Sequence, residues 1–148
     1  MSTFQFSSDA QIESIGMQVL ACTLPKAEWT HAAHLAAAAW IIAVRNDLHA
    51  ARDMPGIISA YNEACGVANT DTGGYHETIT QASLLAVAAF LDAQPRGATL
   101  HAACNALLAS PYGSKDWLLR HWSQPVLFSV AARRGWVAPD LLPLPFSG

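Results

Sequence analysis

Charged residues are scarce in this chain of 148 residues: only 13% are Asp, Glu, Lys or Arg, whereas 52% are hydrophobic. The formal net charge is −3, and the only adjacent basic pair is Arg133-Arg134. This composition gives no electrostatic case for binding nucleic acid or an anionic membrane. So low a charge content indicates either a large core or a surface that meets a partner. We therefore expect a small-molecule ligand or substrate and consider a homodimer.

Cysteines are also few, and long apolar runs are absent. Cys22, Cys65 and Cys104 lie far apart without a CxxC pair, which excludes a disulfide framework and a zinc-finger ligand set. No apolar run reaches the ~18 residues of a transmembrane helix. The first residues have neither the basic start nor the apolar stretch of a secretory signal. We therefore expect a cytoplasmic protein.

Alternating strand patterns are missing too, whereas helical periodicity covers nearly the whole chain. The pattern predicts helices at about residues 9–22, 31–48, 53–65, 75–93, 99–108, 114–121 and 124–134. Ser7-Ser8-Asp9 is expected to cap the first helix, Thr30 the second and Ser114 the sixth, and residues 66–74 form a glycine-rich loop. Residues 1–148 are thus predicted to be one all-α domain. It would be a helical bundle of about five to seven helices with an extended, proline-rich C-terminal tail anchored by Trp136.

The first string that carries chemistry is WTHAAHL, from Trp29 to Leu35. On a helix that begins at His31, both His31 and His34 fall on the apolar stripe, one turn apart. A buried polar group is costly unless it has a partner. Two imidazoles on an apolar face therefore indicate a site.

The second string is GGYHET, from Gly73 to Thr78. On the helix expected from Tyr75, the side chains of His76 and Thr80 lie in the middle of the apolar face, and Glu77 lies on its border. If the first turns of the two helices face each other, both strings contribute to one pocket. Its expected lining is His31, His34, Tyr75, His76, Glu77 and Thr80.

The leading hypothesis for this pocket is a metal centre. His31, His34 and His76 would be the ligands, and Glu77 or Asp71 could supply a carboxylate, leaving positions open for water or oxygen. Zinc would serve hydrolysis, whereas iron or manganese would serve redox chemistry. The protein would then be a metal-dependent hydrolase or oxidoreductase acting on a small polar molecule.

Three alternatives remain open. In a metal-free acid–base enzyme, His76 or His34 would be the base, Glu77 would orient or protonate, and Tyr75 and Thr80 would bind a substrate oxygen. A helical module could bind a small anion or a peptide without turnover. The histidines could also be core residues with satisfied hydrogen bonds.

A third string, LRHWS, adds two candidates. Arg120 could bind a substrate carboxylate, and His121 is a further candidate for substrate binding. Together with WTHxxHL, GYHETIT and the later LFS, it resembles a family of small bacterial all-helical proteins of unknown function, over about residues 24–142. The resemblance implies that the strings belong to one feature, and it favours His121 as a site residue. It supplies no reaction and no cofactor.

Overall fold

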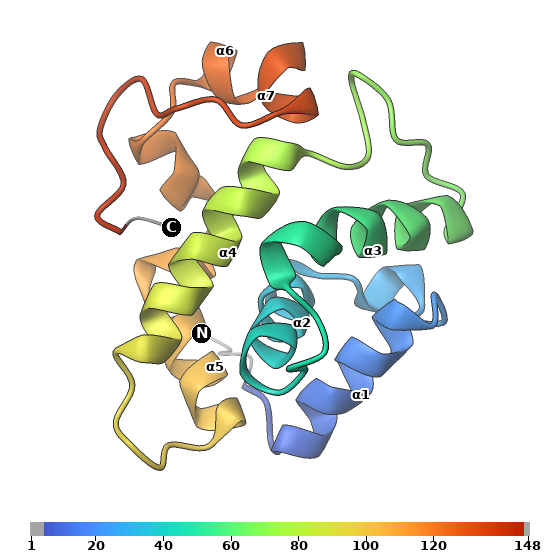
Figure 1. Cartoon of the computed structure of the whole chain (residues 1–148), viewed down its shortest axis with the longest axis vertical. Helices are drawn as coiled ribbons and strands as arrows, with labels where there is room; N and C mark the ends of the chain where they lie inside the picture. Colours follow the sequence, from blue (N-terminus) through green and yellow to red (C-terminus); the bar gives the residue numbers. More distant parts are fainter. Residues whose placement is uncertain (1–4, 147–148) are drawn as a thin grey trace.

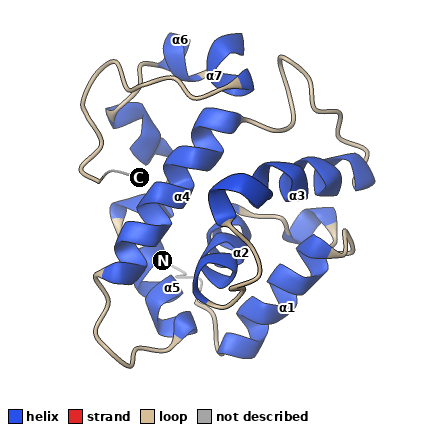
Figure 2. Ribbon diagram, in the orientation of Figure 1, coloured by secondary structure: helices blue, strands red, loops and turns tan. Residues whose placement is uncertain are grey.

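Helices account for all the regular secondary structure in the computed structural model, which describes residues 5–146 (Figures 1 and 2). Within these residues the α-helices are α1 (Asp9–Leu20), α2 (His31–Ala43), α3 (Ala50–Ala64), α4 (Glu77–Asp92), α5 (Leu100–Ala109), α6 (Gln124–Leu127) and α7 (Val130–Arg134). Short 3₁₀ helices are η1 (Lys26–Glu28), η2 (Pro111–Gly113) and η3 (Lys115–Arg120). The predicted all-α bundle is confirmed. No helix in the described range is long and apolar enough to cross a membrane.

Helix α2 is the centre of the bundle because its alanines let other helices approach on several sides. It packs against α1, α3, α4 and α5 (Figure 1). Ala36, Ala37 and Ala39 are fully buried. The closest approach is to α1, where a Cβ atom added to Gly16 would lie 2.2 Å from Cε3 of Trp40. Glycine at this point allows the indole to lie directly on the α1 backbone.

Helix α3 begins at Ala50, earlier than the expected start near Asp53 and Pro55, and Pro55 lies inside it. The early start has a local cause, since His49 Nδ1 accepts a hydrogen bond from the Arg52 amide (3.3 Å). Pro55 has no N–H to donate to the carbonyl of Ala51, four residues earlier. Gln81 Nε2 on α4 donates to that carbonyl instead, at 2.9 Å. The side chain thus compensates for the proline and ties α3 to α4.

Three further helix predictions differ from the structure, two of them near the C-terminus. The helix expected over 124–134 is divided into α6 and α7, because Ser129 Oγ donates to the Val126 carbonyl and accepts from the Ala132 amide. That geometry ends one helix and caps the next. The helix expected over 114–121 exists as the 3₁₀ helix η3. Helix α2 also ends at Ala43, five residues before the predicted end at residue 48.

The C-terminal tail is extended, as predicted, and it lies against the helices through directed hydrogen bonds (Figure 1). Trp122 Nε1 donates to the carbonyl of Val137 at 2.8 Å. The buried hydroxyl of Thr78 accepts from the Val137 amide at 3.1 Å. Trp136 packs edge-on against Trp122, with ring centroids 5.8 Å apart, and is itself 46% exposed.

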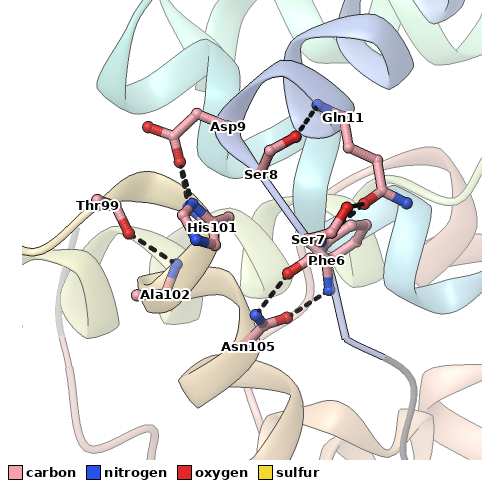
Figure 3. A network of polar contacts seen from close by, with 9 residues as sticks. All are labelled: Phe6, Ser7, Ser8, Asp9, Gln11, Thr99, His101, Ala102 and Asn105. Carbon is pink, nitrogen blue, oxygen red and sulfur yellow. Dashed lines mark hydrogen bonds and ion pairs between the residues drawn. The ribbon is translucent and has the colours of Figure 1, made fainter.

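The N-terminal segment is fixed to α5 by paired polar contacts (Figure 3). Asn105 accepts from the Phe6 amide at 2.7 Å and donates to the Phe6 carbonyl at 2.9 Å. Asp9 accepts from the amide of His101 at 2.7 Å and contacts its Nδ1 at 2.6 Å. These bonds connect α1 to α5, and both helices also pack against α2.

Candidate ligand pocket

A pocket of about 400 Å³ lies between α2, α3 and α4, with η3 and α6 forming its remaining walls. Most of its surface is apolar. The lining residues are Trp29, His31, His34, Leu35, Ala38, Met54, Ile58, Ile79, Thr80, Ser83, Leu84, Lys115, Asp116, Leu118, Leu119, Leu127 and Phe128. Volumes of 300–1,000 Å³ with apolar walls and a few polar groups are typical of small-molecule sites.

His34 faces this pocket without a hydrogen-bond partner among residues 5–146. It lies in the first turns of α2, where Thr30 Oγ1 caps the helix by accepting from the Ala33 amide. The indole of Trp29 packs on the imidazole with centroids 3.7 Å apart. These are the N′ and N4 positions, the pair that meets in a hydrophobic staple.

The surroundings keep His34 neutral. The His34 side chain is exposed at the pocket and packs against Trp29. Burial, followed by the positive charges of His31 and Lys115, lowers the pKa of His34 to about 4. Desolvation and like charges both disfavour the charged form of a histidine. At neutral pH His34 therefore presents one N–H donor and one acceptor nitrogen.

His31 also lines the pocket, but one of its nitrogens is occupied. Its Nε2 lies 3.0 Å from the carbonyl oxygen of Tyr112 in η2. A carbonyl can only accept, so Nε2 carries the proton and donates. His31 therefore connects α2 to η2.

His76 does not line the pocket; it holds a pocket wall in place. Helix α4 begins at Glu77, so His76 is its N-cap, and Nδ1 accepts from the Ile79 amide at 3.1 Å. Nε2 donates to the carbonyl of Leu127 at 2.7 Å. Both ring nitrogens are thus engaged by the backbone, and burial lowers the pKa of His76. The helical-wheel prediction placed His76 inside the helix, although its backbone is extended (φ −135°, ψ 111°).

Tyr75 and Glu77 form a polar pair outside the pocket lining. The Tyr75 hydroxyl donates to Glu77 Oε1. Burial and the contact with Glu77 raise the pKa of Tyr75, so the phenol stays protonated at neutral pH. The other carboxylate oxygen of Glu77 contacts Gln81 Nε2 at 3.4 Å. Of the residues predicted from this second string, only Thr80 reaches the pocket lining.

The glycine-rich loop before α4 is ordered by Asn69. Its Oδ1 accepts from Asn62 Nδ2 at 3.0 Å and from the Tyr75 amide at 2.9 Å, while Nδ2 donates to the Ser59 carbonyl. Gly74 has a φ of +78°, and a Cβ atom there would lie 2.5 Å from a backbone oxygen. Glycine is required at this turn, which delivers the chain to the N-cap of α4.

The two candidates from the third string lie away from the pocket lining. His121 is buried, and its Nδ1 donates to the carbonyl of Leu142 at 2.9 Å. Its own backbone carbonyl accepts from the Leu141 amide at 2.9 Å. His121 therefore binds the C-terminal tail. Arg120 is exposed on η3.

Sequence reasoning missed several residues that line the pocket. Trp29 begins the first string but was not predicted to line the pocket. Lys115 and Asp116 on η3 are the charged residues of the lining. Leu127 and Phe128 form the wall on the side of α6. Nothing in the local pattern distinguishes a lysine after a capping serine from a surface residue. These positions follow from how η3 and α6 pack onto the bundle.

The three histidines predicted as metal ligands do not fit one ion in this arrangement. His76 has no free ring nitrogen, and His31 has one nitrogen committed to Tyr112. Residues 5–146 contain no group of three or more His, Cys, Asp or Glu side chains placed to hold a metal. We therefore derive no step through a metal.

Comparison of the chain with protein-family models, with curated proteins and with solved structures found no match. The functional argument therefore depends on the geometry of the pocket.

Proposed function

We propose that this chain is a small-molecule-binding helical module whose ligand occupies the pocket between α2, α3 and α4. The observation that carries the proposal is His34, a neutral imidazole that faces an apolar pocket without a hydrogen-bond partner in the described part of the chain. A polar group in such surroundings gains most from a ligand that hydrogen-bonds to it.

The remaining pocket residues support an amphipathic ligand. Leu35, Ile58 and Leu84 come from three different helices and offer apolar surface to the body of a small molecule. Ser83 and Thr80 add hydroxyl groups on the α4 side. A few polar groups in an apolar pocket are the usual means by which a site fixes the orientation of its ligand.

The test is titration of the full chain with octan-1-ol, a neutral probe, followed by ¹H–¹⁵N NMR and calorimetry. We expect saturable shifts at Leu35, Ile58 and Leu84. Ser83→Phe should abolish them by filling the pocket. Ala106→Phe, which adds the same ring at an exposed position on α5, should leave binding intact. Saturable shifts that survive Ser83→Phe would refute the pocket assignment. Ala38→Leu is the smaller filling substitution if Ser83→Phe does not fold.

Acid–base catalysis by His34 is a second candidate, favoured by the same unprotonated imidazole, since a general base must be neutral to accept a proton. The other predicted partner, Glu77, is bonded to Tyr75 and does not reach the lining. The probe is 4-nitrophenyl butanoate. Hydrolysis above background that His34→Gln removes at unchanged Tm would favour catalysis. Hydrolysis of the ester at no more than the background rate would favour binding without catalysis.

A further inference from the structure

The titratable groups of the pocket lining are Lys115, Asp116 and the two histidines of α2. Lys115 on η3 and the two histidines of α2 interact electrostatically, since His31 and Lys115 both lower the pKa of His34. The only acidic side chain in the lining is Asp116. The lining residues from α3, α4 and α6 include no titratable group.

Lys115 is not neutralised by the protein itself. Within residues 5–146 the ion pairs are Arg45–Asp47, Arg52–Asp53, His101–Asp9 and Arg134–Asp71, and none includes Lys115. Nor does Lys115 donate a hydrogen bond within that range. Its neighbour in sequence, Asp116, is exposed and lines the same pocket. The exposed Lys115 ammonium and the His34 imidazole thus line one pocket, and neither has a hydrogen-bond partner among residues 5–146.

We propose that the ligand is a carboxylate with an apolar body, its headgroup held by Lys115 and His34. This inference depends on the proposed function, because it names the class of molecule that the same pocket takes. The carboxylate oxygens accept from the Lys115 ammonium and from the N–H of His34. The apolar body lies against Leu35, Ile58, Ile79, Leu84 and Leu127.

Binding of a carboxylate also alters the titration of His34. The ligand's negative charge opposes the effects of Lys115 and His31, so it raises the pKa of His34. Between the pKa values of the free and the occupied protein, binding takes up a proton. Calorimetry at pH 5.5 in two buffers of different ionisation enthalpy measures this uptake, which octan-1-ol should not produce.

The experiment compares octanoate, octanamide, octan-1-ol and octylamine on the full chain at pH 7, because these probes share one chain length and differ in headgroup. We expect octanoate to bind about tenfold more tightly than octanamide. Lys115→Met should abolish that preference. Lys26→Met, which removes the chain's other lysine in exposed η1, is the matched control and should have no effect.

The outcomes separate the two proposals. Equal binding of octanoate and octan-1-ol would overturn the carboxylate assignment and leave the binding module standing. Tighter binding of octylamine would assign the headgroup to Asp116 and would also overturn it. If none of the four probes binds, both the carboxylate assignment and the small-molecule module fail.

Discussion

Replacing Gly16 by alanine sets two opposing effects against each other. Alanine has the higher helix propensity, by about 1 kcal/mol in a helix interior. However, the added Cβ would lie 2.2, 2.7 and 2.8 Å from three ring carbons of Trp40. Favourable carbon–carbon separations are about 3.5–4.0 Å, so either the ring or α1 must move by roughly 1 Å. Trp40 is 2% exposed and belongs to the main core cluster, so the ring has no free space to move into.

Such overpacking costs about 1–3 kcal/mol or more, which exceeds the gain in propensity. We expect Gly16→Ala to lower the free energy of unfolding by about 1–2 kcal/mol, seen as a Tm lower by about 3–6 °C. Gly56→Ala is the matched control. Gly56 lies in α3 with nothing within 4 Å of the added Cβ, so alanine should stabilise by up to about 1 kcal/mol. Differential scanning calorimetry of both variants measures this, and a Gly16→Ala protein as stable as the wild type would refute the close packing of α1 on Trp40.

Three further predictions concern the side chains that build the pocket walls. Gln81→Ala should lower the free energy of unfolding by about 1 kcal/mol in chemical denaturation, because the Ala51 carbonyl then has no donor from Gln81 and none from Pro55. The loss should be smaller in a Pro55→Ala background. His76→Ala should lower the free energy of unfolding by about 2–4 kcal/mol, since it removes an N-cap and a buried hydrogen bond. His76→Asn should retain part of the cap and lose less stability. Equal losses in the two variants would contradict the capping role. His34 should titrate by NMR near pH 4, so the stability that it contributes is present above pH 6.5 and is lost as the pH falls toward 4. Lys115→Met should raise the pKa of His34 only in part, because burial is the larger cause of its shift.

The fold was predictable because its signals are local. A cap was expected within Ser7-Ser8-Asp9 and at Thr30, and the side chains of Ser8 and Thr30 each accept a hydrogen bond from a backbone amide. The glycine-rich loop and the extended tail also follow from residue type. The errors lie where a side chain from another element decides the outcome. At Pro55, Gln81 of α4 donates to the Ala51 carbonyl in place of the missing backbone amide.

The histidines show the limit of the helical wheel. The wheel assumes helical backbone at every residue, and His76 lies just outside the helix, where its side chain turns back to the Ile79 amide. Its other partner, the carbonyl of Leu127, is distant in sequence. His31 likewise finds the carbonyl of Tyr112. Sequence reasoning located the imidazoles but could not tell which of them has a hydrogen-bond partner, which His34 lacks within residues 5–146.

The most direct test of the account is to locate a bound neutral probe by intermolecular nuclear Overhauser effects between octan-1-ol and the methyl groups of the full chain. We predict contacts with Leu35, Ile58 and Leu84, together with a shift of the His34 ring protons. Contacts confined to the groove beneath the C-terminal tail, at Leu85 and Leu144, would contradict the assignment of the α2–α3–α4 pocket as the ligand site.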